Sequence, residues 1–221
     1  MEARKYPYVK ICCISSVEEA WMAVQFGASA LGLVGHMPSG PGILPDPLIA
    51  EIAQAAPPPV ATFLLTSETR AEDIIAHHAR VLTSTVQIVD APEPGAYPRL
   101  RAALGPVRIV QVIHVRGEAS LDEALEAAPY VDALLLDSGN PNLAVKELGG
   151  TGRVHDWQMS RRIREAADKP VFLAGGLHAG NVREAIDAVG PFGLDLCSGV
   201  RSHGRLDPHK LDAFFTAIER A

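Results

Sequence analysis

The feature that most constrains this chain is the regular alternation of short apolar runs with amphipathic stretches. Across its 221 residues, eight runs rich in aliphatic and β-branched residues are each followed by a stretch with helical spacing. Such a pattern is typical of consecutive βαβ units and a parallel sheet. Eight pairs in so short a chain favour a closed (β/α)8 barrel, the TIM barrel fold, over an open doubly wound sheet, which usually has about five or six strands.

The pattern also places the expected elements. We expect strands over residues 8–14, 30–34, 60–65, 85–89, 107–113, 133–137, 171–174 and 194–197, and helices over residues 17–26, 46–55, 69–79, 96–104, 121–127, 157–167, 181–189 and 208–220. Capping residues support several helix starts: Ser15 and Ser16, Ser67, and Asp207. With no linker-like segment, the chain is predicted to form one domain over residues 1–221.

Composition narrows the classes of partner. A net charge of -6 leaves no basic face for nucleic acid, and no apolar run approaches the roughly 20 residues of a membrane span. The polar N-terminus does not look like a signal peptide, so we expect a cytoplasmic protein, either a monomer or a homodimer. Its three cysteines make an unlikely disulfide framework for a chain of this length, which favours a reducing compartment.

Two glycine-bearing turns predict a phosphate site. Gly175 and Gly176 follow the seventh expected strand, and Ser198 and Gly199 follow the eighth. Barrels that bind sugar phosphates commonly hold the phosphate on backbone N–H groups of these two loops. A single Gly-Gly pair would more often be a simple turn, but paired turns at these two strands favour a small phosphorylated ligand.

The ends of the first and sixth expected strands carry reactive groups. Strand alternation places Lys10 and Cys12 on one face and Ile11 and Cys13 on the other. A nearby ammonium favours a thiolate, which can act as a base, although a lone strand cysteine is more often an inert core residue. Asp137 ends the sixth strand, where a carboxyl with a raised pKa can act as a general acid, or simply cap the next loop.

Two further expectations concern loops and thiols. The connections over residues 35–45 and 138–155 are long and lie on the rim of the expected site, and glycines at positions 139, 149, 150 and 152 make the second a lid candidate. No CxxC or HxxxH spacing points to a metal, so no metal is expected. Cys12 and Cys197 belong to adjoining strands of a closed barrel, which leaves a regulatory disulfide between them open.

The ordered motifs resemble the phosphoribosylanthranilate isomerase family over most of the chain. The family's Lys-Ile-Cys-Gly-Ile corresponds to residues 10–14, its Gly-Ala-x-Ala-Leu-Gly to residues 27–32, its Leu-Leu-Leu-Asp to 134–137 and its Gly-Gly-Thr-Gly to 149–152. Its Phe-Asp-Trp is similar to residues 155–157, its Leu-Ala-Gly-Gly-Leu to 173–177, and its Asp-x-Ser-Ser-Gly-Val to 195–200.

The resemblance implies an isomerase of tryptophan biosynthesis that needs no cofactor or metal. The reaction is an Amadori rearrangement, in which an N-glycosidic ribose phosphate opens and becomes an amino-ketose. By this resemblance Cys12 is the general base, Asp137 the general acid, and Gly175, Gly176, Ser198 and Gly199 the phosphate-binding residues. Further expected substrate contacts are Lys10, Gly150, Thr151 and Asp195.

Departures from the family pattern keep two alternatives open. Pro41 stands where the family has an arginine for the anthranilate, residues 87–90 read Gln-Ile-Val-Asp in place of Gln-Leu-His-Gly, and Arg201 replaces a glutamate. We expect all three changes on the rim facing the non-phosphate half of the ligand, where His36 or Arg116 are possible substitutes for the arginine. The alternatives are a paralogue that isomerises another phosphorylated amino-sugar and a phosphate-binding barrel without catalysis.

Overall fold

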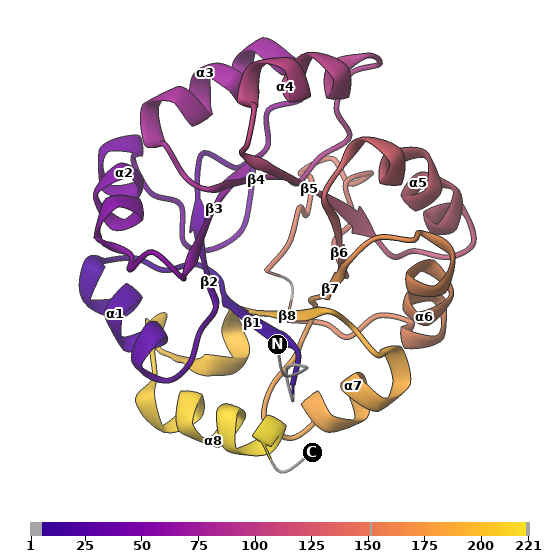
Figure 1. Ribbon diagram of the computed structural model, residues 1–221. Coiled ribbons are helices and arrows are strands. Elements are labelled where there is room, and N and C mark those ends of the chain that lie inside the picture. Colours follow the sequence, from indigo (N-terminus) through magenta and orange to yellow (C-terminus); the bar gives the residue numbers. More distant parts are fainter. Residues whose placement is uncertain (1–5, 151, 220–221) are drawn as a thin grey trace.

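Eight parallel strands close into a barrel with helices around it (Figure 1). The computed structural model describes residues 6–150 and 152–219. The strands are β1 (Tyr8–Ile11), β2 (Ala30–Val34), β3 (Ala61–Thr66), β4 (Thr85–Ile88), β5 (Arg108–His114), β6 (Ala133–Asp137), β7 (Val171–Leu173) and β8 (Gly193–Leu196). The helices are α1 (Val17–Gln25), α2 (Asp46–Ala55), α3 (Ala71–Val81), α4 (Ala96–Leu104), α5 (Ala119–Ala127), α6 (Trp157–Ala166), α7 (Val182–Val189) and α8 (Pro208–Glu219). The predicted (β/α)8 barrel is confirmed.

The barrel closes where the first strand meets the last. β1 pairs with β2 on one side and with β8 on the other, and Lys10 is in register with both Ala30 and Asp195. The ends of β1, β7 and β8 come earlier than the sequence predicts, so Cys12, Ala174 and Cys197 lie just beyond their strands. Because parallel strands share one direction, these three residues lie at the same end of the barrel.

Short elements add to the alternating pattern. Two 3-10 turns, η1 (Ala128–Tyr130) and η2 (Ser198–Val200), and an antiparallel pair, β9 (Arg201–Ser202) with β10 (Arg205–Leu206), are not predicted from the sequence. Elements of two or three residues carry no periodic signal, which is why pattern analysis misses them.

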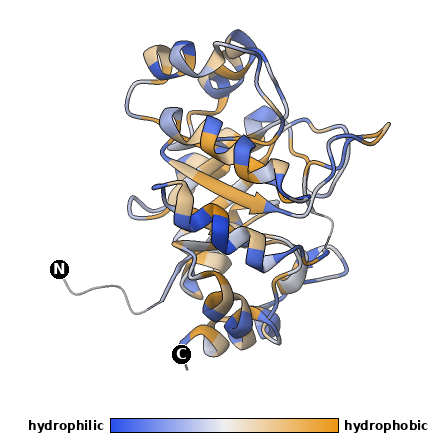
Figure 2. Ribbon diagram, turned by 90° about the vertical axis from the view of Figure 1, so that its right-hand side faces the viewer, coloured by the Kyte–Doolittle hydropathy of each residue, from blue (hydrophilic) through white to orange (hydrophobic). Residues whose placement is uncertain are grey.

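Side chains alternate between two apolar layers. One layer packs the outside of the strands against the helices and includes Ile11, Leu31 and Leu64. The other fills the barrel and includes Phe63 and Phe172, whose rings meet edge to face at 5.9 Å. The helices in Figure 2 accordingly mix hydrophilic and hydrophobic segments, whereas the strand in view is largely hydrophobic. Strands buried on both faces explain the nearly continuous apolar runs of the sequence.

Capping follows the sequence at two of the three expected helix starts. Ser16 Oγ accepts the N–H of Glu19 at 3.2 Å, and Asp207 Oδ1 accepts the N–H of His209 at 2.9 Å. The prediction for Ser67 is wrong: α3 starts after Arg70, and the Ser67 hydroxyl donates to the carbonyl of His36. Within the described residues, no helix has the length and apolarity needed to cross a bilayer.

Candidate active site

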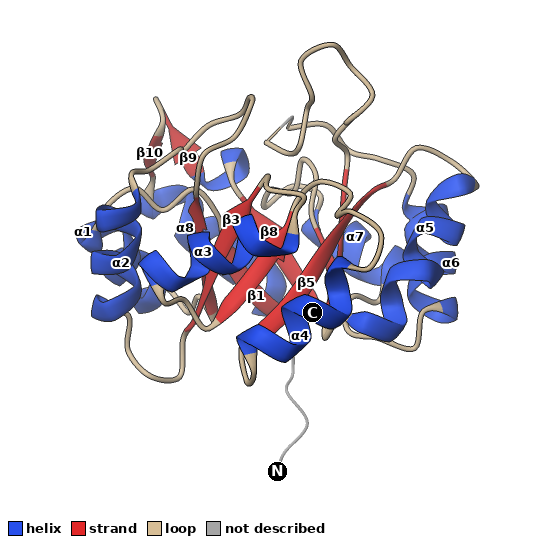
Figure 3. Cartoon of the chain, turned by 90° about the horizontal axis from the view of Figure 1, so that it is seen from above, coloured by secondary structure: helices blue, strands red, loops and turns tan. Residues whose placement is uncertain are grey.

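A pocket opens at the carboxyl ends of the strands, where the long loops stand above the barrel (Figure 3). It holds about 740 Å³ of empty space, part of it open to solvent. Its wall combines residues that follow β1, β6, β7 and β8 with residues of the two long loops. The carboxyl-terminal face of the barrel is where barrel enzymes carry their sites.

Cys12 enters the pocket wall directly after β1. Its N–H donates to the carbonyl of Leu196 at 2.7 Å, which fixes its backbone to β8. The side chain is 6% exposed and lies against Gly32 of β2, where a Cβ would stand only 2.9 Å from the Cys12 sulfur. The glycine in β2 therefore provides the space that the thiol occupies.

Asp137 ends β6 and lines the same pocket. Burial raises the pKa of its carboxyl above the usual range, although Oδ1 accepts the N–H of Ser138 at 2.7 Å. Gly149, in the loop after β6, lies over the carboxylate, since a Cβ there would stand 3.0 Å from Oδ2. The structure thus brings Cys12 and Asp137, which are far apart in sequence, to one cavity, and it favours the proton-donating form of the carboxyl.

The turn after β7 requires its glycines. Gly175 and Gly176 have φ angles of 84° and 63°, values that only glycine adopts without strain, and both line the pocket. The side-chain amide of Asn181, at the start of α7, donates to the carbonyl of Gly176 at 3.0 Å. The turn is therefore held in a backbone conformation that exposes it to the cavity.

The turn after β8 approaches this first turn closely. Ser198 lines the pocket, whereas Gly199 is not among the lining residues. A Cβ on Gly199 would stand 1.9 Å from the carbonyl oxygen of Leu177. Gly199 therefore allows the two turns to meet. Because it does not line the pocket, it has no direct contact with a ligand bound there.

The expected substrate contacts fall in three places. Gly150 and Asp195 line the pocket, and Thr151 lies outside the described residues. Lys10 is fully buried below the cavity, where its Nζ lies 2.9 Å from Asp195 Oδ1 and 5.3 Å from the centre of the Phe63 ring. Lys10 is therefore an internal counter-ion of Asp195, and it does not reach the pocket lining.

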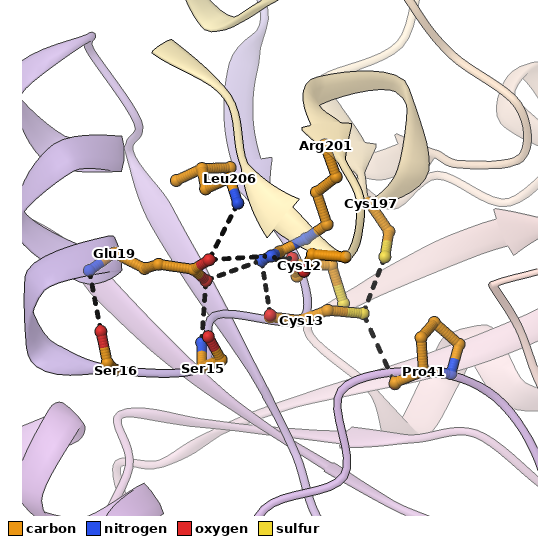
Figure 4. Close-up of polar contacts among 10 residues, drawn as sticks. Cys12, Cys13, Ser15, Ser16, Glu19, Pro41, Cys197, Arg201 and Leu206 are labelled. Carbon is orange, nitrogen blue, oxygen red and sulfur yellow. Dashed lines mark hydrogen bonds and ion pairs between the residues drawn. The ribbon is translucent and has the colours of Figure 1, made fainter.

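Cys13 does not follow the predicted alternation. The sequence places it with Ile11 on the outer face, but it packs with Cys12 in the inner layer and lines the pocket. The reason is local: β1 ends at Ile11, and Cys13 has a φ of 60°, which turns its side chain inward. Its Sγ lies 2.8 Å from Sγ of Cys197 (Figure 4), so the thiol partner of Cys197 is Cys13 and not Cys12.

The two long loops meet over the pocket. The hydroxyl of Ser39 donates to the carbonyl of Lys146 at 2.5 Å, and a Cβ on Gly150 would stand 2.6 Å from Cδ of Pro41. The length of the two loops is visible in the sequence, but their mutual contact depends on tertiary structure and cannot be predicted from it.

The rim prediction is correct for one of its three departures, Pro41. In the second, the changed residues 88–90 do not line the pocket, and only Gln87, which matches the family motif, does. Pro41 and Gln87 line the pocket, and among the described residues Gln87 Oε1 is buried with no hydrogen-bond partner. Arg201 is different, because its guanidinium turns away from the cavity to Glu19 and to the carbonyls of Cys12 and Cys13. The expectation that Arg201 faces the ligand is therefore wrong.

Cations are scarce at this cavity. Within residues 6–150 and 152–219, no lysine or arginine lines it, and neither do the suggested substitutes His36 and Arg116. Across the same residues, no group of three or more His, Cys, Asp or Glu side chains has the arrangement of a metal site. The chemistry that this pocket offers is therefore that of three thiols, two buried carboxyls (Asp137 and Asp195) and the backbone of two turns.

Comparison with known proteins agrees with this arrangement. The family model described as N-(5'-phosphoribosyl)anthranilate (PRA) isomerase matches residues 10–217. N-(5'-phosphoribosyl)anthranilate isomerase 2 of Methanosarcina mazei is 35% identical over 210 residues, which cover 93% of this chain and 91% of that protein.

Solved structures agree in fold as well. Phosphoribosyl anthranilate isomerase of Thermotoga maritima superposes with a TM-score of 0.81 at 28% identity, covering 97% of this chain and all of that one. A second isomerase structure, in complex with reduced 1-(o-carboxyphenylamino)-1-deoxyribulose 5-phosphate, has a TM-score of 0.78 at 26% identity, with 97% and 100% coverage. With a family match over nearly its whole length and relatives above 30% identity, the chain belongs to the N-(5'-phosphoribosyl)anthranilate isomerase family.

Proposed function

We propose that this protein isomerises N-(5'-phosphoribosyl)anthranilate to the corresponding amino-ketose phosphate in tryptophan biosynthesis. The observation that carries the proposal is the meeting of Cys12 and Asp137 in one pocket beside the turns of Gly175, Gly176 and Ser198. A related isomerase was crystallised with a ligand that carries a 5-phosphate and a carboxyphenylamino group. The same division of the ligand into an anionic end and an amine end fits a pocket with a backbone cradle on one side and loops on the other.

The acid acts first in this scheme. Asp137 donates its proton to the ribose ring oxygen, the bond between C1′ and that oxygen breaks, and the nitrogen lone pair forms the C1′–N double bond. Burial raises the pKa of this carboxyl, which favours its protonated form and suits Asp137 to this step. The preference for the neutral form supports Asp137 as the donor.

The base completes the rearrangement. Cys12, as its thiolate, removes the proton from C2′, and the electrons of that bond form an enolamine that tautomerises to the amino-ketose. The hydrogen bond from the Cys12 N–H to β8 and the space beside Gly32 hold the sulfur in the pocket wall. Lys10 acts indirectly in this scheme, by neutralising Asp195 below the thiol.

The phosphate is assigned to the two turns. Backbone N–H groups of Gly175, Gly176 and Ser198 are the proposed donors, because the positive φ angles after β7 bring the main chain to the cavity. Gly199 contributes by letting the turns approach, and Gly150, Thr151 and Asp195 remain proposed contacts of the sugar. The scheme uses no cofactor or metal.

Other properties follow as proposals. We propose one domain over residues 1–221 that acts in the cytoplasm as a monomer or homodimer. Its partner is the small phosphorylated substrate, and neither nucleic acid nor a membrane is involved.

Complementation of a tryptophan auxotroph lacking the isomerase tests the proposal directly. The wild-type chain should restore growth, and Cys12→Ala and Asp137→Asn should not, because each removes one proton-transfer group. Asp73→Asn, a change at an exposed carboxylate on α3, is the matched control and should complement. Growth supported by Cys12→Ala would contradict the assignment of the base.

One observation favours a second candidate, the same rearrangement on a different N-substituent. No cation of the described residues lines the pocket, and Pro41 occupies the position of the family's arginine, so an anthranilate carboxylate has no charged partner there. Turnover of phosphoribosylanthranilate and of analogues with an uncharged amine substituent separates the candidates. A higher kcat/KM for the uncharged analogues would favour the second one, and a chain that binds phosphate but turns over neither would be a non-catalytic barrel.

A further inference from the structure

Two thiols that the proposed reaction does not use lie side by side at the rim. Sγ of Cys13, after β1, is 2.8 Å from Sγ of Cys197, after β8, although the residues are 184 positions apart in sequence (Figure 4). Both cysteines are unoxidised in this structure, and both line the pocket. Cys12 is also a neighbour of Cys13, and its sulfur lies against Gly32.

The backbone conformation at Cys13 is one that favours glycine, so a side chain at this position is unexpected. Its φ of 60° lies in the left-handed region, which is strained for a non-glycine residue. The family motif has glycine at this position and serine at the position of Cys197. Glycine would adopt the same φ without that cost, so the chain carries a thiol here at the expense of backbone strain.

The surroundings make the two thiols unequal. Sγ of Cys13 donates to the carbonyl of Pro41 at 3.7 Å, and Cys13 is buried whereas Cys197 is partly exposed. Hydrogen bonds with Cys12 and Cys197, together with burial, raise the pKa of Cys13. The hydrogen bond between Cys197 and Cys13 and the nearby Arg201 guanidinium lower the pKa of Cys197. Cys197 is therefore the thiol that ionises first and is open to a small reagent.

We propose that Cys13 and Cys197 are a reversible oxidation site that forms a disulfide with a small-molecule disulfide, such as oxidised glutathione, as the oxidant. The Cys197 thiolate attacks one sulfur of the reagent, whose S–S bond breaks and releases a small thiolate. The Cys13 thiol then gives its proton to that thiolate, attacks Cys197 Sγ and expels the second small thiolate, which takes up the proton that Cys197 lost on ionising. Two protein thiols lose two electrons and two protons, and the small disulfide becomes two thiols.

The disulfide joins the two halves of the proposed active site. A disulfide bond is about 2.05 Å long, so the sulfur atoms must approach one another by roughly 0.8 Å from their present separation. Cys13 directly follows the proposed base Cys12, and Cys197 directly precedes Ser198 of the proposed phosphate turn. Because a misplacement of about 1 Å can cost on the order of a hundredfold in rate, we expect oxidation to lower kcat/KM at least about tenfold. This effect on activity rests on the proposed function, whereas the disulfide itself does not.

Peptide mapping tests the thiol pair. The reduced chain is incubated with oxidised glutathione, free thiols are blocked with iodoacetamide, and the digest is analysed by mass spectrometry. We expect a peptide linking Cys13 to Cys197, with Cys12 alkylated, and its loss after dithiothreitol. A stable glutathione adduct without the link, or a link that involves Cys12, would overturn the proposal.

Two variants distinguish formation of the disulfide from its effect on activity. Cys13→Gly and Cys197→Ser introduce the residues of the family motif, so they fit the backbone, and neither should form the link. In each, the ratio of oxidised to reduced kcat/KM should be near one, compared with about one tenth or less in the wild type. Equal ratios in wild type and variants would overturn the effect on activity.

The variant Cys12→Ser distinguishes a failure of the proposed oxidation site from a failure of the proposed function. This variant keeps both thiols of the proposed site and should still form the Cys13–Cys197 link, while it loses the proposed base. If the wild type turned over no substrate, the peptide map would still decide whether the oxidation site exists.

Discussion

Asp195 Oδ1 lies 2.9 Å from Lys10 Nζ, and the two residues are register partners on the strands that close the barrel. Both side chains are almost entirely shielded from water. A charge taken out of water is costly unless it is paired, so each residue makes the presence of the other tolerable. The pair therefore couples the closure of the sheet to the electrostatics beneath the proposed base.

Breaking this pair should destabilise the protein strongly. Asp195→Asn leaves the Lys10 ammonium without a counter-ion, and we expect a loss of about 3–5 kcal/mol in the free energy of unfolding, measured in urea. The double variant Lys10→Met with Asp195→Leu removes both charges and should recover most of that loss. A single variant within about 1 kcal/mol of the wild type would contradict the role assigned to the pair.

Asp137→Asn should stabilise the fold while removing activity. The folded-state pKa of Asp137 lies above the ordinary value of 3.8, so its contribution to stability is fully present below pH 3.8 and is lost as the pH rises through the folded pKa. At neutral pH the variant should therefore have the larger free energy of unfolding. Each unit of pKa difference corresponds to about 1.4 kcal/mol, which makes the gain measurable.

The pH series supplies the control for this prediction. The difference between Asp137→Asn and the wild type should shrink as the pH falls toward 3.8, where the wild-type carboxyl is also neutral. A difference that stays constant between neutral pH and pH 4 would show that ionisation of Asp137 is not its cause.

Gly199→Ala should separate the two turns. Its Cβ would meet the Leu177 carbonyl oxygen at 1.9 Å, a backbone contact that no side-chain rotation can relieve. We expect weaker binding of inorganic phosphate, by about tenfold or more, and a loss of stability of roughly 1–3 kcal/mol. Gly180→Ala is the matched control, because its Cβ would meet only the exposed His178 ring, at 3.1 Å. Equal phosphate affinity in the two variants would refute the proposed role of Gly199.

Arg201→Met should lower stability in a pH-dependent way. Burial alone would raise the pKa of Glu19, but hydrogen bonds from Arg201 and Leu206 hold it below the ordinary 4.5. The stability that Glu19 contributes is present above pH 4.5 and is lost as the pH falls through its lower folded pKa. The difference between wild type and variant should therefore be widest near neutral pH and should narrow below pH 4.5. Urea titrations at pH 7 and pH 4 measure both values, and a difference that grows at pH 4 would exclude the ion pair as its origin.

The barrel could be predicted because its signals are local and repeated. Each strand is a short apolar run, each helix an amphipathic one, and eight repetitions leave little choice of architecture. Asp46–Ala55 and Ala96–Leu104 were predicted to the residue, while α3 begins and ends two residues later than expected. Helix ends depend on single capping bonds, and the expected cap at Ser67 is used elsewhere.

The candidate site could be predicted only where its residues lie at the ends of the barrel strands. Asp137 ends β6 and Cys12 directly follows β1, so topology alone brings them to one rim. Cys13 could not be placed, because strand alternation ends two residues before it and its φ is set by tertiary contacts. Arg201 was misplaced for a similar reason: its partner Glu19 lies on α1, and no sequence spacing relates the two.

The Lys10–Asp195 contact also bears on the order in which the barrel can form during synthesis. β1 leaves the ribosome early, whereas the strand that carries its counter-ion is the last of the eight to be made. We therefore expect the barrel to close, and Lys10 to be buried, only once β8 is available, because β8 supplies both the neighbour of β1 and the counter-ion of Lys10.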